Sequence, residues 1–212
     1  MSGIITPDWP APRNVVAGTT MRGEDAPLDA VFLNQVHGAR VVTIKDIRSA
    51  TSLLDADAVT GNRAGDICCV RTADCLPLLL CAKDGSEVAA VHGGWRGVLA
   101  GVIENTVAAL KTRPSALLAW LGPAISQPAF EVGGEVRDAY NRRDPHSAAC
   151  FAPNARGRWQ ADLYGLGRMR LADAGVTAIY GGNFCTFGDR ERFYSYRRNP
   201  ICGRMVTFIR IL

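Results

Sequence analysis

Short apolar runs, separated by glycine, aspartate and proline, fill the first half of the chain. Runs of this length, built from β-branched and other apolar residues, are typical of strands. They predict strands at residues 14–18, 30–33, 40–44, 66–70, 76–82 and 87–91. The longest run, residues 76–82, is far shorter than the roughly 18 residues that a membrane-spanning helix needs, so we expect no transmembrane helix.

The pattern changes to a helical period after Trp95. Apolar residues then recur every three or four positions, and Lys111, Arg113 and Pro114 follow the last of them, as is typical of a helix end. The pattern therefore predicts one helix from Trp95 to about residue 110. The apolar positions are Leu99, Val102, Ile103, Val107 and Leu110.

The rest of the chain alternates between strand-like and helix-like segments. The pattern predicts strands at 116–122, 177–180 and 205–211, and helices at 134–143 and 162–174. Asp162 is a suitable N-cap for the last helix, and Gly175 is suitable just after its end. Because strands and helices come in mixed order, we expect an α+β fold with mixed β-sheets flanked by helices.

The length of 212 residues fits one domain, residues 1–212. Pro7, Pro10 and Pro12 predict an extended arm at residues 1–13. The first residues lack the basic start and apolar stretch of a secretory signal. The seven cysteines are an odd number, and four of them lie in or beside apolar runs, which favours reduced thiols. We therefore expect a cytoplasmic protein that does not bind membranes.

Positive charge gathers in the second half of the chain, although the net charge is only +4. A nucleic-acid surface would need a denser basic cluster with aromatic platforms. The single candidate consists of Arg190, Arg192, Phe193, Tyr194, Tyr196, Arg197 and Arg198. Scattered arginines are more typical of a solvated face, so we expect a small phosphorylated or phosphate-using substrate and no nucleic acid.

Two of the three histidines occur in similar settings: His37 in QVHG and His92 in VHGG each follow an apolar run and precede a glycine. Between them, Cys75 follows a polar turn at the start of the most apolar run. We expect all three side chains at the ends of strands. Two imidazoles and one thiolate suit zinc and also copper, and three protein ligands leave one position open, as in catalytic zinc sites.

The same side chains also allow chemistry without a metal. Cys75 would then be the nucleophile and His92 its base, with Asp74 or a backbone carbonyl orienting the His92 ring. The spacing of the three residues matches no short metal-binding motif, so the pattern leaves both interpretations open.

The HGGWRG motif adds a candidate anion site. The amides of Gly93 and Gly94 precede the predicted helix, whose N-terminus favours negative charge. Arg96 offers a planar group suited to two phosphate oxygens. Arg71 lies four residues before Cys75, and we expect its side chain either at the strand end that carries Cys75 or paired with Asp74.

These motifs together resemble the YfiH family, also called the laccase-domain or polyphenol-oxidase family. In chain order they are QVHG, ADAVTG, RTADCLPLLL, VHGGWRG, LGPAI, FEVGGEV and FYSYRR, from about Asn34 to the C-terminus. The resemblance implies a single α+β domain with a layered fold, likened to a cysteine-hydrolase toxin domain. It also implies zinc, with copper as an alternative, on His37, Cys75 and His92.

The activity that the resemblance implies is zinc-dependent phosphorolysis of purine nucleosides: adenosine, guanosine, inosine and methylthioadenosine. Adenosine deaminase activity is implied as well, and we expect a monomer or weak homodimer. Phosphate held by Arg96, Gly93 and Gly94 would attack the ribose, and Asp74, Glu131 and a metal-bound water are candidate proton donors to the purine. A Cys–His hydrolase or deamidase and a copper-dependent polyphenol oxidase remain alternatives.

One departure from the family lies before the QVHG motif. Members usually carry a Gly-Gly-x-Ser stretch and an Asn-Leu stretch after an early Thr-x-Arg. Here Thr20, Met21 and Arg22 lead through GEDAPLDAVFL directly to NQVHG. Because the missing residues would be expected near the substrate, a non-catalytic nucleoside-binding protein is a further alternative.

Overall fold

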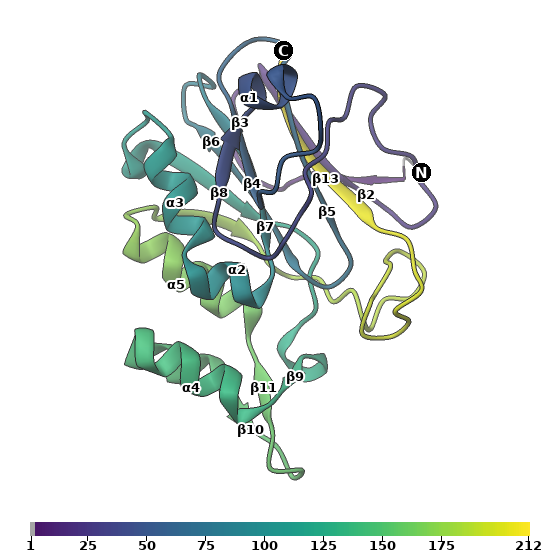
Figure 1. The fold of residues 1–212 in the computed structure, drawn as a ribbon, viewed down its shortest axis with the longest axis vertical. Coiled ribbons are helices and arrows are strands. Elements are labelled where there is room, and N and C mark those ends of the chain that lie inside the picture. The colour runs from purple at the N-terminus through teal and green to yellow at the C-terminus, as the bar shows by residue number, and fades with distance from the viewer. Residues whose placement is uncertain (1–2) are drawn as a thin grey trace.

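A six-stranded mixed sheet forms the middle of the molecule in the computed structural model, which describes residues 3–212 (Figure 1). Its strands, in spatial order, are β12 (Ala178–Gly181), β8 (Leu117–Leu121), β6 (Leu76–Ala82), β7 (Val88–Gly93), β4 (Ala58–Gly61) and β3 (Val41–Thr43). The two outer pairs, β12 with β8 and β3 with β4, are parallel, and the inner pairs are antiparallel. The predicted α+β fold is therefore confirmed.

Strand β6 is buried on both faces, which explains its uninterrupted apolar sequence. Leu78 and Leu80 lie in the core beneath the helices, whereas Leu79 and Cys81 lie in the core shared with a second sheet. Side chains of a strand alternate between its faces, so a central strand between two cores needs apolar residues at every position.

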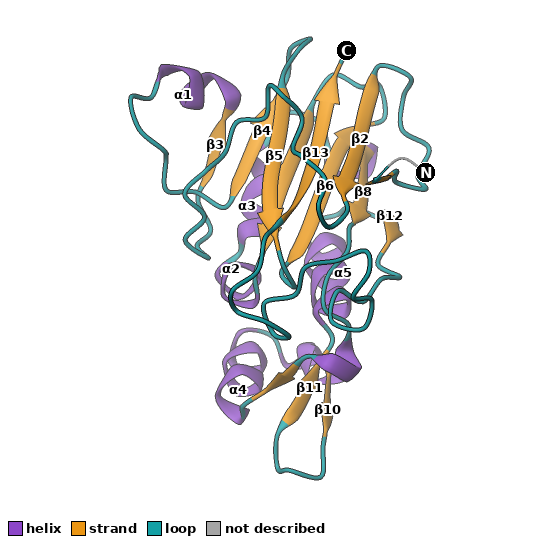
Figure 2. Ribbon diagram, turned by 90° about the vertical axis from the view of Figure 1, so that its right-hand side faces the viewer, coloured by secondary structure: helices purple, strands orange, loops and turns teal. Residues whose placement is uncertain are grey.

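The second sheet is antiparallel and packs against the first (Figure 2). Its strands, in order, are β1 (Ile4–Ile5), β2 (Val15–Thr20), β13 (Met205–Ile211) and β5 (Ile67–Thr72). Val15, Val70 and Ile209 meet Leu79 and Trp120 of the larger sheet in one apolar cluster. The N-terminal and C-terminal segments are thus neighbours in one layer.

Helices cover the opposite face of the six-stranded sheet: α2 (Trp95–Ala100), α3 (Val102–Ala109) and α5 (Leu163–Asp173) (Figure 1). The prediction of one continuous helix from Trp95 was wrong, because Gly101 adopts a left-handed φ of 100° and separates α2 from α3. Asp162 caps α5 as predicted, accepting a hydrogen bond from the Gly165 amide, and Gly175 follows its end with φ 85°.

A small lobe lies at the lower end of Figure 1. It contains α4 (Gly134–Arg143), which was predicted, and a three-stranded antiparallel sheet, which was not. The strands of that sheet, in order, are β10 (Phe151–Pro153), β11 (Trp159–Ala161) and β9 (Glu131–Val132). Residues 3–212 also contain three short 3-10 helices: Pro114–Ala116 directly before β8, Gln127–Ala129 before β9, and Pro145–Cys150 before β10.

Two predicted strands differ from the structure. Residues 30–33 form a loop, in which Ala30 and Phe32 cover the outer face of the second sheet. The strand predicted at 40–44 is shorter, because Thr43 and Asp46 form a capping box that starts α1 (Ile44–Ser49). Apolar content alone does not distinguish a covering loop from a strand.

The first two residues of the predicted N-terminal arm lie outside the described residues. Within the arm, Ile4–Ile5 form β1, and Trp9 and Ala11 pack against the cluster between the two sheets. In the described residues, no helix is long and apolar enough to span a membrane.

Candidate metal centre

His37 lies in a loop before β3, not at the end of a strand as predicted. Its backbone has a φ of 58°, an uncommon value for a residue other than glycine. The carboxylate of Asp57 stabilises this conformation by accepting hydrogen bonds from the amides of Val36, His37 and Gly38 at 3.3, 2.9 and 2.7 Å. Asp57 directly precedes β4, so this strand of the sheet fixes the loop.

His92 lies near the end of β7 and is 3% exposed. Its Nδ1 is 2.7 Å from Oδ1 of Asp57, which is fully buried, and its amide donates to the Asp57 carbonyl. An Nδ1–H bond to a carboxylate leaves Nε2 free as a ligand atom. One aspartate therefore positions both histidines.

Cys75 lies in the turn between β5 and β6. The preceding residue, Asp74, has a φ of 90° and does not orient the His92 ring. Its carboxylate instead accepts hydrogen bonds from Thr186 Oγ1, Ser195 Oγ and the Arg197 amide at 2.6, 3.0 and 2.7 Å. Asp74 thus ties the Cys75 turn to the segment that precedes β13.

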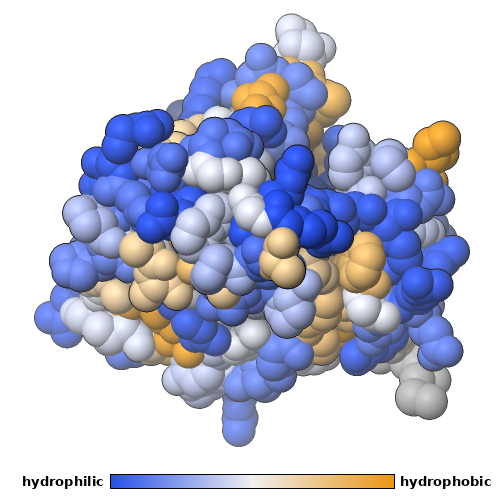
Figure 3. Space-filling model, turned by 90° about the horizontal axis from the view of Figure 1, so that it is seen from below, coloured by the Kyte–Doolittle hydropathy of each residue, from blue (hydrophilic) through white to orange (hydrophobic). Residues whose placement is uncertain are grey.

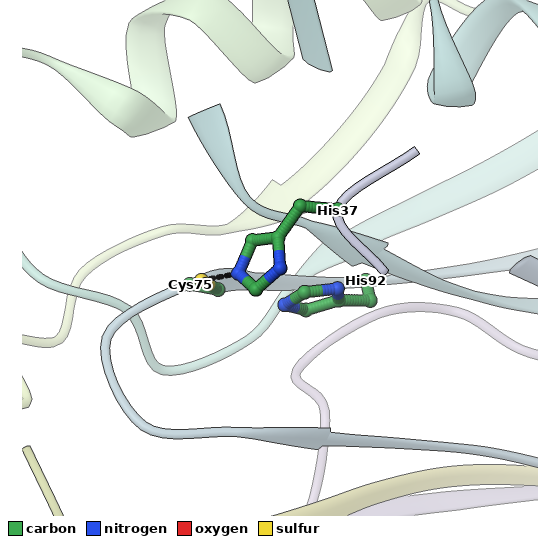
Figure 4. A group of neighbouring side chains, drawn as sticks. All are labelled: His37, Cys75 and His92. Carbon is green, nitrogen blue, oxygen red and sulfur yellow. Dashed lines mark hydrogen bonds between the residues drawn. The ribbon is translucent and has the colours of Figure 1, made fainter. Parts of the chain in front are cut away.

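The three predicted ligands converge, as Figure 4 shows. One ligand atom from each of His37, Cys75 and His92 lies within 4.8 Å of the other two. Cys75 Sγ is 3.8 Å from His37 Nε2, and the two imidazole rings meet edge to face with centroids 4.8 Å apart. Tetrahedral zinc would place its nitrogen and sulfur ligands roughly 3.4–3.6 Å apart. The donor atoms and their spacing therefore fit a metal ion.

The charges of the three groups also suit a cation. Burial acts to raise the pKa of Cys75, but interactions with His37 and His92 outweigh it and lower the pKa to about 6. Burial acts to lower the pKa of His92, but Asp57 and Cys75 raise it to about 9. Asp57 has a lowered pKa, since hydrogen bonds from His92, Gly38 and His37 outweigh its burial. Without a metal, a thiolate therefore faces an imidazolium.

The three ligands line a cavity of about 770 Å³. Its wall comes from both halves of the chain, and its residues are Asn34, Gln35, His37, Arg71, Thr72, Ala73, Asp74, Cys75, His92, Trp95, Arg96, Ile125, Phe130, Leu163, Tyr196, Arg197, Cys202 and Arg204. Seen from the end that carries α4, the molecular surface is mainly hydrophilic, with small apolar patches (Figure 3). The cavity is large enough for a small-molecule ligand.

Four arginines lie in this cavity wall: Arg71, Arg96, Arg197 and Arg204. Each guanidinium lies over an aromatic ring, those of Phe32, Trp95, Phe130 and Tyr196, at 5.0, 4.5, 5.6 and 5.9 Å from the ring centroid. Within residues 3–212, none of the four pairs with a carboxylate. The cavity therefore offers unneutralised positive charge.

Gly93 and Gly94 allow close packing around the ligands. A Cβ on Gly94 would lie 2.6 Å from His37 Cδ2 and 3.3 Å from Cys75 Sγ, and one on Gly93 would lie 2.9 Å from the Leu76 carbonyl oxygen. The two glycines thus stand beside the three candidate ligands, but they are not among the residues of the cavity wall described above. The predicted contact of their amides with phosphate stays a prediction.

Glu131 lies outside the cavity wall. Its carboxylate binds Asn154 and Arg156, and these contacts, despite partial burial of the group, lower its pKa. The third histidine, His146, is exposed and contacts Asp144. Both lie in the small lobe, away from the three ligands.

Sequence reasoning missed Asp57, Arg197 and Arg204 as site residues. Asp57 carried a usable signal, because the aspartate directly before the apolar strand of ADAVTG needs hydrogen-bond partners when it is buried. Arg197 and Arg204 lacked such a signal, because they reach the cavity only through the folded segment after β12.

The fold and the site define a layered α+β protein with a His-Cys-His group that can hold a metal ion. The family described as multi-copper polyphenol oxidoreductase laccase matches residues 13–212. This chain belongs to that family, the YfiH or laccase-domain family.

Relatives resemble the chain over nearly its whole length. A Pseudomonas aeruginosa protein named purine nucleoside phosphorylase is 43% identical, with 99% of this chain and 98% of the relative covered. The purine nucleoside phosphorylase YfiH of Escherichia coli is 40% identical, with 99% of both covered. The alignment with the Pseudomonas protein extends over 242 residues, more than the 212 of this chain, so the relative has residues without a counterpart here.

Solved structures agree with the fold. A Neisseria meningitidis protein of the DUF152 family has a TM-score of 0.93 at 38% identity, with 99% of both chains covered. YlmD from Geobacillus stearothermophilus has a TM-score of 0.88 at 26% identity, with 99% of this chain and 96% of that chain covered.

Proposed function

We propose that this protein is a zinc-dependent purine nucleoside phosphorylase. The observation that carries the proposal is the convergence of His37, Cys75 and His92 in a cavity with four arginines that pair with no carboxylate of residues 3–212. Curated relatives at 43% and 40% identity bear the name purine nucleoside phosphorylase. The proposed substrates are phosphate with adenosine, guanosine, inosine or methylthioadenosine, and adenosine deamination is the proposed second activity.

Phosphorolysis requires an anion and a neutral nucleoside in one cavity. The guanidiniums of Arg71 and Arg96 bind phosphate, whose negative charge balances the positive charge of the cavity arginines. A phosphate oxygen then forms a bond to the ribose anomeric carbon while the bond to the purine nitrogen breaks, and the purine leaves with the bonding electrons and acquires a proton.

A zinc ion on the three side chains would supply a Lewis acid with one coordination position open to substrate. Asp57 orients the His92 imidazole and holds the His37 loop, so both rings keep their ligand nitrogens turned toward Cys75. Asp74 positions Cys75; we do not assign it the proton transfer, because its carboxylate already accepts three hydrogen bonds.

Zinc suits this site better than a multicopper centre does. The chain has three histidines, and the third, His146, has a side chain that is 93% exposed. In the described part of the chain, one group of three or more candidate ligands is present, whereas several coppers would need several such groups. We propose that the protein acts in the cytoplasm on small molecules, as a monomer or weak homodimer.

The test is an assay of purified, metal-quantified protein with inosine and adenosine, with and without phosphate. We expect about one zinc per chain and release of free base only with phosphate. His37→Ala, Cys75→Ala and His92→Ala each lose zinc and activity together, whereas His146→Ala and Cys185→Ala, which change a histidine and a cysteine outside the centre, keep both. Zinc and nucleoside binding without turnover would overturn the enzyme in favour of a binding protein.

A Cys–His hydrolase is a second candidate, because the structure adds the group that this chemistry needs. Cys75, His92 and Asp57 form a nucleophile, a base and a carboxylate that orients the base. The same atoms cannot hold zinc and act as a free nucleophile. Chelation therefore separates the two: activity that survives zinc removal and ends on alkylation of Cys75 would favour the hydrolase.

A further inference from the structure

Tyr196 is the most exposed large apolar residue in the wall of the cavity, with 54% of its surface open. The other large apolar residues of the wall belong to the core beneath the helices or pack against it: Trp95, Ile125, Phe130 and Leu163. Tyr196 belongs to none of the apolar clusters within residues 3–212. Its side chain therefore lines the cavity without filling the interior.

The backbone on both sides of Tyr196 is fixed, although its ring is exposed. The Ser195 hydroxyl and the Arg197 amide donate to the carboxylate of Asp74 at 3.0 and 2.7 Å. The Arg197 guanidinium also donates to the Glu131 carbonyl at 2.9 Å. Because a tyrosine has only two side-chain torsions, a fixed backbone presents its ring to a ligand at a low entropic cost.

The ring of Tyr196 has room for a flat partner. The guanidinium of Arg204 lies over it, 5.9 Å from the ring centroid, and is itself held by hydrogen bonds to the carbonyls of Cys202 and Gly203 at 2.8 and 3.0 Å. In the part of the chain that the structure describes, no other aromatic ring or guanidinium stacks on Tyr196. With more than half of the residue exposed, the ring can take a second stacking partner from the cavity.

We propose that Tyr196 is a substrate-contacting residue whose ring stacks on the purine base of the nucleoside. A purine is flat and aromatic, so it matches an exposed tyrosine ring, whereas the arginines of the cavity match phosphate. Stacking on an aromatic side chain tolerates different bases, because every base has a π-face. Tyr196 thus accepts adenosine, guanosine and inosine alike. The inference rests on the proposed function, since it takes a purine nucleoside as the ligand.

The test compares Tyr196→Leu, which removes the aromatic ring but keeps an apolar side chain, with Tyr196→Phe, which keeps the ring. Phosphorolysis of inosine is measured on the zinc-loaded full chain. For Tyr196→Leu we expect KM for inosine to rise about 10-fold. The kcat should stay unchanged, because the base is stacked before and during bond breaking. Tyr196→Phe should keep both values. Ile201→Ala, which shortens an exposed apolar side chain outside the cavity wall, is the matched control and should keep them as well.

The KM values for the other substrates separate stacking on the base from a structural role. In the reverse reaction, KM of Tyr196→Leu for hypoxanthine should rise about 10-fold, whereas KM for ribose 1-phosphate should stay at the wild-type value. KM for phosphate in the forward reaction should also stay, because Arg204 keeps its bonds to two carbonyls. An equal rise for phosphate and inosine would show that Tyr196 acts by supporting Arg204 and would overturn the proposal. An unchanged KM for inosine in Tyr196→Leu would overturn it as well.

Failure of the proposed function gives a different result. If the wild type releases no base from any nucleoside, the phosphorylase is wrong, and calorimetric binding of inosine and of hypoxanthine decides the role of Tyr196. Binding of both that weakens about 10-fold in Tyr196→Leu and is kept in Tyr196→Phe supports the stacking contact. A wild type that binds neither compound would overturn it.

Discussion

At the scale of single residues, Asp57 determines the geometry of the candidate metal centre. Its carboxylate accepts hydrogen bonds from backbone amides of the His37 loop and bonds to the ring of His92. One buried carboxylate therefore sets the positions of two candidate ligands that are 55 residues apart in sequence. A carboxylate behind a histidine ligand also fixes the tautomer and makes the imidazole a better donor.

Replacing Asp57 with asparagine should therefore weaken zinc binding by about 10- to 100-fold. The amide cannot accept equally well from three backbone amides and an imidazole, so the rings lose their alignment. Competition with a chromophoric chelator measures the affinity. Asp55→Asn, which alters a nearby aspartate that contacts Asn34, should bind zinc like the wild type. Equal affinity of Asp57→Asn and the wild type would contradict the role given to Asp57.

The Cys75 thiol should react at unusually low pH in the metal-free protein. Its pKa is lowered from 9.0 to about 6, so the thiolate, which is the reactive form, predominates at neutral pH and is lost as the pH falls through 6. Alkylation with iodoacetamide, followed at Cys75 by peptide mass spectrometry, should have its midpoint near pH 6. The denatured chain is the control, and its alkylation midpoint should lie near the ordinary thiol pKa of 9.0. The same high midpoint in the folded protein would show that the histidines do not stabilise the thiolate.

At the scale of secondary-structure elements, the metal centre depends on close contact between α2 and the His37 loop. A Cβ on Gly97 of α2 would lie 2.8 Å from the carbonyl oxygen of Gly38, next to His37. That carbonyl belongs to the backbone and cannot move without its loop, which Asp57 holds from the other side. The helix can therefore approach the loop only with glycine at this position.

Gly97→Ala should displace the His37 loop and lower both zinc affinity and stability, although alanine favours helix more than glycine does. We expect a loss of roughly 1–3 kcal/mol, as for other overpacked sites. Denaturant unfolding and zinc titration measure the two effects. The control is Gly134→Ala at the start of α4, where an added Cβ meets nothing within 4 Å and should be neutral. A Gly97→Ala protein with wild-type zinc affinity would show that the loop yields.

At the scale of the whole molecule, the sequence predicted several of the longer elements and the three side chains that converge as candidate ligands. Strand β6 was predictable from its continuous apolar run, and helix α5 from its N-cap Asp162 and from Gly175 after its end. The three-stranded sheet was not, because β9 and β11 are only two and three residues long and pair through tertiary contacts. Arg197 and Arg204 of the cavity wall were missed for the same reason. Residues 182–204 lack regular secondary structure, so tertiary contacts determine their position.

Asp74 is the link that binds this segment, and its replacement should separate substrate binding from metal binding. Asp74→Asn keeps a residue that tolerates a positive φ, yet its amide group accepts poorly from Thr186, Ser195 and the Arg197 amide together. We expect a stability loss of about 1–3 kcal/mol and faster amide hydrogen exchange over residues 184–204.

Zinc content of Asp74→Asn should stay at the wild-type level, because none of the three lost bonds involves a metal ligand. KM for the nucleoside and phosphate should rise, since Tyr196, Arg197 and Arg204 lose their fixed positions in the cavity wall. Asp173→Asn, an exposed aspartate at the end of α5, is the matched control. If Asp74→Asn instead kept its KM and lost only kcat with a shifted pH profile, Asp74 would be the proton donor to the purine rather than the link between the Cys75 turn and the cavity wall.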